Sequence, residues 1–431
     1  MFTYRECDLP DDPVFPTDLT KLGYFINDND QIRMISDPEL GFQYKINRND
    51  RFNVKQREAF NECIRKIVFE RITAAGLGVL RLPLGAMQND AHVPILVSDN
   101  LHKASRFVVY FGEPNQDLGI WSNRAIGSDG IQVGCMVEFA QAVLGEDRHP
   151  TGTALILANS GQLVWYCAGG KAMTQESWLA LNLSSAVDSL PSQTNRNKIL
   201  GNLNAFQHVQ YIFEWILSPR LRQGTTVDVI AMSEGGLSAM HYLKKHWSLW
   251  RNHISGMCVG SPIQTVLFDL DKTELSNPDS FTAFVSRRCR GYLVGPNVLG
   301  TPEAGYVEHG CNCYASGEDS FTECIMPKAW RHMLSWLDKL QVDPSYQEQP
   351  RLLLGDMDAG IQQPLERMVS MSNAETDIDE EVLRNTDPSE LGGDIVVTEA
   401  MSGSRDIQKK RDYNDKVLEW AQGLAEEDKE N

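Results

Sequence analysis

The segment VDVIAMSEGGLSAMHYL, residues 227–243, constrains the fold more than any other part of the sequence. Its first six residues form a nearly unbroken apolar run, which is typical of a buried strand. Ser-Glu-Gly-Gly then predicts a tight turn, and apolar residues at helical spacing follow it. A strand, a sharp turn and a helix in this order place Ser233 at the carboxyl end of a sheet.

The rest of the first 340 residues alternates between strand and helix patterns. Short apolar runs predict strands at RFVVYFG, ALILAN, ISGMCVG and NCYA. Helical spacing of apolar residues predicts helices over 54–75, 131–143, 207–217 and 328–340. The polar and glycine-containing stretch 162–200 is interpreted as an insertion over the sheet. This alternation predicts an α/β fold with a mainly parallel sheet covered by helices, preceded by a hairpin and a helix.

Charge separates the chain into two parts. The formal net charge is −18, and residues 343–431 carry 22 acidic against 9 basic side chains. Apolar residues occur singly in most of that region, so it has little to bury. We therefore expect a folded domain over 13–340 and an acidic disordered tail over 341–431. Apolar residues near helical spacing suggest a terminal helix at about 405–425, either docked or solvated.

The sequence contains no apolar run long enough for a membrane span and no signal-peptide pattern at its start, which predicts an intracellular protein without membrane contact. Its nine cysteines are then expected as free thiols. A zinc site at His309, Cys311, Cys313 and Cys324 is the alternative, but C-x-C is not a finger spacing. We predict neither a metal nor a cofactor.

The turn around Ser233 matches the nucleophile elbow of serine hydrolases in part. That motif is G-x-S-x-G, and here Ala231 replaces the first glycine while Gly235 and Gly236 are present. An elbow presents the serine above the sheet at the start of a helix, whose N-terminus favours a developing oxyanion. The candidate elbow and oxyanion residues are Gly112, Ser233, Glu234, Gly235 and Gly236.

The partners that a serine nucleophile needs are missing from their expected positions. In this chain order an acid follows the next strand and a histidine follows the last strand. Ser261 and Phe321 occupy these two positions, and Asp269 and Asp271 come later in the loop. His309 and His332 are the displaced histidines that could replace the base, although each is equally a surface or core residue.

The loop after RFVVYFG is also unsuited to catalysis. In lipase-like enzymes this loop supplies backbone N–H donors to the oxyanion. Here Gly112 is followed by Glu113 and Pro114. Proline has no N–H, and a glutamate would repel the developing negative charge. We predict that Ser233 is a vestigial nucleophile.

Several segments together resemble fungal Argonaute-binding proteins of the Arb-two type. The residues that carry the resemblance are FPTDLTKLGYFINDNDQIRMI, FQYKINRNDRFNVKQREAFNECIRKIVFERI, RFVVYFG, AMSEGG and ASGED, over about 13–340. The same domain is similar to the C-terminal region of fungal class II histone deacetylases and to an animal co-transcriptional regulator family. Complete members have H-G, serine, aspartate and histidine, and here only Gly112, Ser233, Gly235 and Gly236 match. Phe111 stands at the loop histidine.

The resemblance implies a nuclear protein, with the cytoplasm as a second compartment. It implies contact with Argonaute or another chromatin-silencing protein during small-RNA-directed heterochromatin formation, with siRNA bound at most indirectly. The hypothesis is therefore a non-catalytic scaffold of undetermined oligomeric state. A serine hydrolase using Ser233 is the alternative. Direct RNA binding is a third, based on Arg287, Arg288 and Arg290, which a solvated loop explains equally well.

Overall fold

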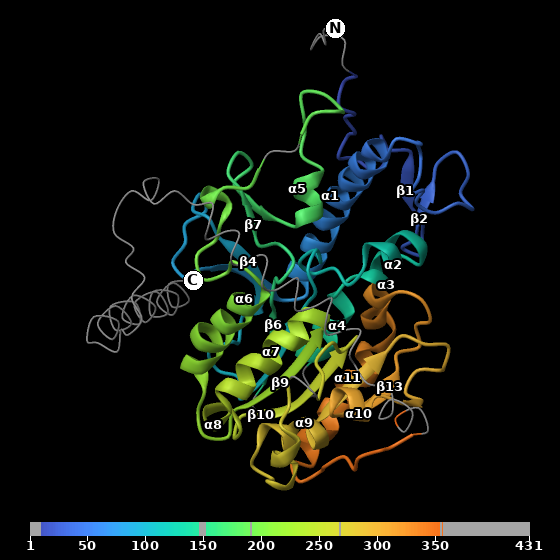
Figure 1. Ribbon diagram of the computed structural model, residues 1–431. Coiled ribbons are helices and arrows are strands. Elements are labelled where there is room, and N and C mark those ends of the chain that lie inside the picture. The colour runs from blue at the N-terminus through green and yellow to red at the C-terminus, as the bar shows by residue number, and fades with distance from the viewer. Residues whose placement is uncertain (1–9, 146–151, 190–191, 267–268, 354–355, 357–431) are drawn as a thin grey trace, which may run out of the picture. The chain divides into compact units, whose positions relative to one another are not determined.

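The computed structural model describes residues 10–145, 152–189, 192–266, 269–353 and 356. Its centre is a nine-stranded sheet in the order β12-β13-β11-β10-β9-β5-β6-β4-β3 (Figure 1). The six strands from β13 to β6 run parallel, while β12, β4 and β3 join antiparallel at the two edges. The strands are β3 (Leu77–Leu82), β4 (Val93–Ser98), β5 (Arg106–Phe111), β6 (Thr153–Leu157), β9 (Thr226–Met232), β10 (Ile254–Gly260), β11 (Cys289–Leu293), β12 (Pro302–Glu303) and β13 (Asn312–Ala315).

Helices cover both faces of this sheet, as its apolar strands require. One face is covered by α1 (Asp50–Ala74), α4 (Val137–Leu144) and α11 (Ile325–Val342), which contact β3, β6 and β10 respectively and meet at α4. The other face is covered by α6 (Ala205–Tyr211), α7 (Ser233–Lys245), α8 (Trp247–Trp250) and α9 (Phe281–Arg288). The alternation of strand and helix patterns correctly predicted a mainly parallel α/β sheet. Strands β5 and β6 are fully buried, as strands covered on both faces must be.

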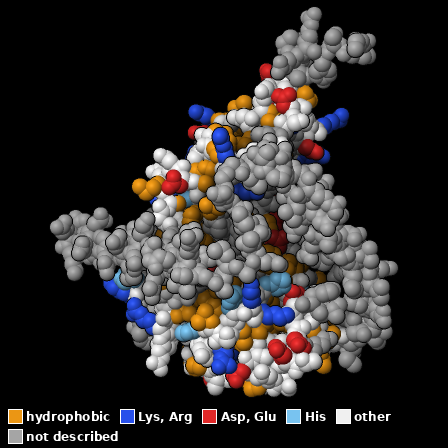
Figure 2. All heavy atoms as spheres, turned by 60° about the vertical axis from the view of Figure 1, so that its left-hand side comes forward, with side chains coloured by type: hydrophobic (Ala, Val, Ile, Leu, Met, Phe, Trp, Pro, Cys, Tyr) orange, Lys and Arg blue, Asp and Glu red, His pale blue; other side chains and the backbone are white. Residues whose placement is uncertain are grey.

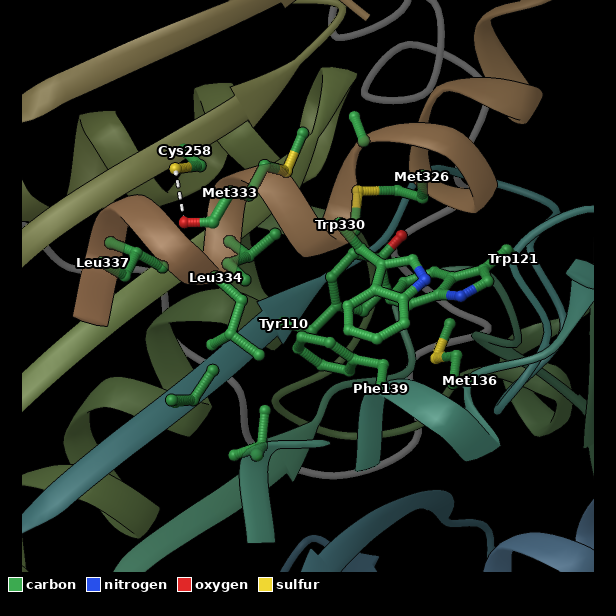
Figure 3. Close-up of a cluster of buried hydrophobic side chains, with 14 of the residues drawn as sticks. Tyr110, Trp121, Met136, Phe139, Cys258, Met326, Trp330, Met333, Leu334 and Leu337 are labelled. Atoms are coloured by element: carbon green, nitrogen blue, oxygen red, sulfur yellow. Dashed lines mark hydrogen bonds between the residues drawn. The ribbon is translucent and has the colours of Figure 1, made fainter. Parts of the chain in front are cut away.

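A large core lies between the sheet and helices α4 and α11. Aromatic rings pack in a chain from Tyr110 through Trp121 and Phe139 to Trp330, with centroid separations of 4.8, 5.4 and 5.7 Å (Figure 3). The Cys258 thiol lies against the carbonyl oxygen of Met333 on α11. Such edge-to-face aromatic contacts stabilise a core beyond the area that they bury.

The N-terminal part folds onto α1. Strands β1 (Tyr24–Ile26) and β2 (Ile32–Met34) form an antiparallel hairpin around the Asn27–Asp30 turn. Phe42 stacks on Phe60 of α1 at 3.9 Å. The alternating segment FQYKI has no strand pairing. Phe42 is buried against α1, whereas Tyr44 packs on Phe42 and is partly exposed, as is Ile46.

The predicted helix over 131–143 is interrupted. It is divided into α3 (Ile131–Gly134) and α4, preceded by α2 (Asn123–Ser128), because Cys135 is extended and bridges Ile120. The carbonyl of Gly134 accepts hydrogen bonds from the backbone of Trp121 and Ser122 instead of continuing the helix. A tertiary backbone contact therefore overrides the local periodicity.

The insertion predicted over 162–200 forms a hairpin, β7 (Val164–Tyr166) and β8 (Lys171–Met173), followed by α5 (Gln175–Leu179). The side-chain amide of Asn159, after β6, donates to the carbonyl of Pro94 on β4 and to Oε1 of Gln162, which attaches the insertion to the sheet. Asn159 also joins a buried histidine that follows the insertion. The backbone N–H of Asn159 donates to Nε2 of His208, so Nδ1 donates to Asn202. Burial lowers the pKa of His208 to about 3, which keeps this histidine neutral. His208 is thus a structural residue.

The described backbone continues beyond Leu340, the expected end of the folded domain. The backbone continues as an ordered strap across β11 and β13, where Glu348 accepts hydrogen bonds from Arg290, Asn312 and Tyr314. Glu348 is buried, and Arg290 holds the pKa of this carboxyl below its usual value against the opposing effect of burial. The short helix α10 (Tyr306–His309) precedes β13, and the Asp356 carboxylate accepts the N–H of Gly305 just before this helix. The remaining tail, including the expected helix at 405–425, lies outside the described residues.

Candidate functional site

Ser233 lies where the sequence predicted it, directly after β9 and at the first residue of α7. Its φ is +41°, in the left-handed region that residues with a Cβ rarely adopt. Strain of this kind is retained only where the surrounding structure imposes it. The turn is therefore an elbow of the nucleophile type, which lifts the serine to the carboxyl end of the central strands.

The two glycines after Ser233 allow α7 to lie close to the sheet. A Cβ added to Gly235 would be 2.5 Å from the carbonyl oxygen of Gly112 and 2.7 Å from that of Phe111. A Cβ on Gly236 would be 2.7 Å from Cγ1 of Val259 on β10. Both positions need glycine for packing. The glycine pair is thus explained by the approach of helix and strand, whether or not the serine reacts.

Glu113 is the side chain that interacts with Ser233. The Ser233 hydroxyl interacts with the Glu113 carboxyl and favours its charged form. Burial outweighs this contact and raises the pKa of Glu113 from 4.5 to about 7, and the nearby charges of Glu323 and Glu234 act in the same direction. A carboxyl group thus lies at the start of α7, beside the position where a hydrolase would stabilise an oxyanion.

The acid position after β10 contains no carboxylate. Ser261 follows the strand directly with φ +47°, and its N–H donates to the carbonyl of Tyr292 on β11. Asp269 is engaged elsewhere: one oxygen lies 2.6 Å from Nε2 of His241, and the other accepts the N–H of Thr265. His241 is on α7 two turns beyond Ser233, so this pair does not serve the elbow.

The loop after β13, where the base was sought, presents a glutamate toward the elbow. Phe321 is 43% exposed and lies under the guanidinium of Arg124 at 3.9 Å. Glu323 is the residue of this loop whose charge affects Glu113, and it also accepts hydrogen bonds from Arg124 and Ser122. A carboxylate with these partners is a poor substitute for a histidine base.

Neither displaced histidine reaches Ser233 in the described structure. Nδ1 of His309 is 2.9 Å from the carbonyl oxygen of Gln264, so this buried histidine donates to the backbone. Nδ1 of His332 lies 2.9 Å from the hydroxyl of Tyr292. Burial lowers the pKa of His332, with Arg290 contributing. Both are engaged within the core around β11 and β13.

The cysteines show no arrangement suited to a metal. Within the described residues, no three His, Cys, Asp or Glu side chains are grouped to hold an ion. Cys311 and Cys313 are buried free thiols on or beside β13, and the neighbouring Cys311 and burial raise the pKa of Cys313 well above its usual value. Cys324 faces Ser122 instead. The Cys313 thiol is therefore protonated at neutral pH, which disfavours metal binding.

Sequence reasoning identified Glu113 as incompatible with an oxyanion but missed its contact with Ser233, and it missed Glu323 entirely. For Glu113 a signal existed, because a residue directly after a central parallel strand lies at the same sheet edge as the elbow. For Glu323 no local signal existed, since its approach depends on the path of the loop after β13.

The strand order, the parallel central strands and the elbow together define an α/β-hydrolase-like protein. The model of the Arb2 domain family matches residues 15–297, and the chain belongs to this family. The resemblance found in the sequence is thereby confirmed. No curated protein matches the sequence significantly.

Solved structures with a similar fold include a histone deacetylase from Saccharomyces cerevisiae, at 9% identity and a TM-score of 0.36, covering 64% of this chain and 95% of that one. The esterase LipW from Mycobacterium marinum has 12% identity and a TM-score of 0.27, covering 58% and 72%. A putative esterase from Staphylococcus aureus has 8% identity and a TM-score of 0.29, covering 68% and 94%.

Proposed function

We propose that this protein is a non-catalytic scaffold that uses the α/β-hydrolase-like fold to present a binding surface. The observation that carries the proposal is the partner of Ser233: a glutamate interacts with its hydroxyl where catalysis needs a histidine and an open oxyanion site. Since Glu113 is about half ionised near neutral pH, negative charge already lies beside the position of the developing oxyanion. This raises the barrier to ester hydrolysis.

The role we propose for the scaffold is contact with Argonaute, or with another chromatin-silencing protein, during small-RNA-directed heterochromatin formation in the nucleus. Membership of the Arb2 domain family supports this proposal. On the face shown in Figure 2, basic and acidic side chains are interspersed, which favours contact with protein over contact with an RNA backbone. Within the described residues, no helix is long and apolar enough to cross a membrane.

The serine hydrolase alternative has one specific observation in its favour. A carboxyl group with a pKa of about 7 could accept the Ser233 proton near neutral pH. A fluorophosphonate probe distinguishes the two functions. We expect no labelling of the purified chain, with a known serine esterase as the positive control. Stoichiometric labelling that disappears in both Ser233→Ala and Glu113→Gln would establish the hydrolase instead.

Partner binding needs a separate measurement. Purified Argonaute from the same organism, with and without a loaded small RNA, is titrated into the purified chain in a calorimeter. We expect saturable binding that Ser233→Ala leaves unchanged, because that substitution removes only a hydroxyl at the elbow. Absence of binding to both forms of Argonaute would reject this partner, while the probe result would still decide whether the scaffold is catalytic.

A further inference from the structure

A surface groove lies between the α2–α3 region and the N-terminal half of α11. It consists of two cavities of about 320 Å³ each. Asp129, Val133 and Pro327 line both cavities, so the two adjoin each other, and we call them together the α2–α11 groove. Trp330 lines one end, and Tyr44 and Phe321 line the other.

The cations of this groove are neutralised by neighbouring carboxylates. Arg124 pairs with Glu323 and Lys328 with Glu318, each at 2.7 Å. Arg331 pairs with Glu138 of α4. These ion pairs leave the basic side chains of the groove without net charge to offer a ligand.

The carboxylates show a different pattern. Asp30 is paired with Arg71 through two hydrogen bonds of 2.7 Å. Asp129, at the junction of the two cavities, is exposed, and no hydrogen bond or ion pair to its side chain occurs within the described part of the chain. The residual charge of the groove is therefore negative and is located at its centre.

Asp129 does not stabilise α2. It caps the C-terminal end of this helix, where exposed carbonyl groups disfavour a carboxylate. The lining of the groove is mixed, and two of its apolar side chains are partly exposed. Val133 is 44% exposed and Phe321 is 43% exposed. An unpaired carboxylate in a groove with exposed apolar side chains complements a cation flanked by apolar groups.

We propose that the α2–α11 groove docks a peptide segment of a partner protein that carries a lysine or arginine between apolar residues. The basic side chain pairs with Asp129, and its apolar neighbours cover Val133 and Phe321. Charge complementarity is what selects this occupant: an acidic segment would meet Asp129 unpaired and would find Arg124, Lys328 and Arg331 already occupied. The inference goes beyond the proposed scaffold function and does not depend on Ser233.

The test uses fluorescein-labelled peptides of the form Ala-Leu-X-Leu-Ala-Gly, with X as lysine, arginine, glutamine or glutamate, and fluorescence polarisation with the full-length chain. We expect the lysine and arginine peptides to bind about fivefold more tightly than the glutamine peptide, as one partly exposed ion pair allows. Asp129→Asn should abolish this preference. Asp99→Asn, which removes an exposed carboxylate elsewhere with the same change in net charge, should preserve it.

Val133→Ser tests the apolar contribution and should weaken all four peptides several-fold while leaving the preference for lysine. Circular dichroism confirms that each variant is folded, which is expected because Asp129 and Val133 are exposed. Three results would each overturn the proposal. They are no saturation by the lysine peptide up to about 1 mM, tighter binding of the glutamate peptide, and an unchanged preference in Asp129→Asn.

Discussion

Replacing Glu113 by glutamine should make the protein more stable at alkaline pH and leave its stability unchanged at acidic pH. Burial raises the pKa of this carboxyl from 4.5 to about 7. Between these two values the folded chain retains a proton that the unfolded chain has released. Stability therefore falls as pH rises through this window, because the unfolded state gains free energy by releasing the proton while the folded state keeps it.

The size of the effect follows from the shift. Each pKa unit corresponds to about 1.4 kcal/mol. The shift of Glu113 therefore sets an upper limit of about 3 kcal/mol on the change in unfolding free energy that its ionisation causes. Partial solvent access reduces this to about 1 to 2 kcal/mol. Glutamine keeps the shape of the side chain and an acceptor for the Ser233 hydroxyl, and it carries no charge at any pH.

The assay is urea unfolding of both proteins at pH steps from about 4.5 to 8, followed by tryptophan fluorescence with linear extrapolation. The quantity compared is the difference in unfolding free energy between Glu113→Gln and the unmodified chain, which removes the pH dependence that both share. Glu70→Gln, at an exposed position on α1, is the control and should show a flat difference. A flat difference for Glu113→Gln, or one that favours the unmodified chain at pH 8, would refute the reasoning.

Three further substitutions test the packing around the elbow and its supports by urea unfolding. Gly235→Ala should cost about 1 to 3 kcal/mol, since its Cβ meets backbone oxygens that cannot move aside, whereas Gly295→Ala, with no atom within 4 Å, should be near neutral. Arg106→Leu should cost about 3 to 5 kcal/mol, because it leaves the buried Asp228 carboxylate, now 2.7 Å from Arg106, without its cation. A chain ending at Val342 should be less stable than one ending at Met357, because only the shorter chain loses Glu348; equal stability would show that the strap contributes nothing.

The central elements of the fold could be predicted from the sequence because burial determines them locally. The runs that became β5, β6 and β9 are apolar throughout, as strands covered on both faces must be. Helix α1 was expected over 54–75 and spans Asp50–Ala74; its start at Asp50 is fixed by the side chain of Asn49, which accepts the N–H of Arg51. The elbow could be predicted because few backbone conformations fit a glycine pair that follows an apolar strand so closely.

The features that sequence reasoning missed depend on contacts between distant segments. Glu348 lies in a polar stretch that reads as solvated, and its burial follows from Arg290, 58 residues earlier on β11. The interruption of the expected helix at Cys135 likewise depends on a tertiary contact, the antiparallel bridge to Ile120. At the candidate site, the positions of Ser261 and Phe321 in the loops could be anticipated, but the approach of Glu323 to Glu113 could not.

An elbow is weak evidence for catalysis in this fold, for a physical reason. Gly235 allows α7 to contact the end of β5, and Gly236 allows it to contact β10, so the turn is needed to cover the sheet whatever Ser233 does. Replacing the histidine or the acid of a triad changes the stability of such a fold little, because those side chains lie in loops. Replacing the two glycines would disrupt the packing of α7 against the sheet. A chain that stopped catalysing would therefore keep its elbow and change its loops. The combination of an intact elbow with Glu113, Ser261 and Glu323 in the loops around it is the pattern expected of a binding scaffold derived from such a fold.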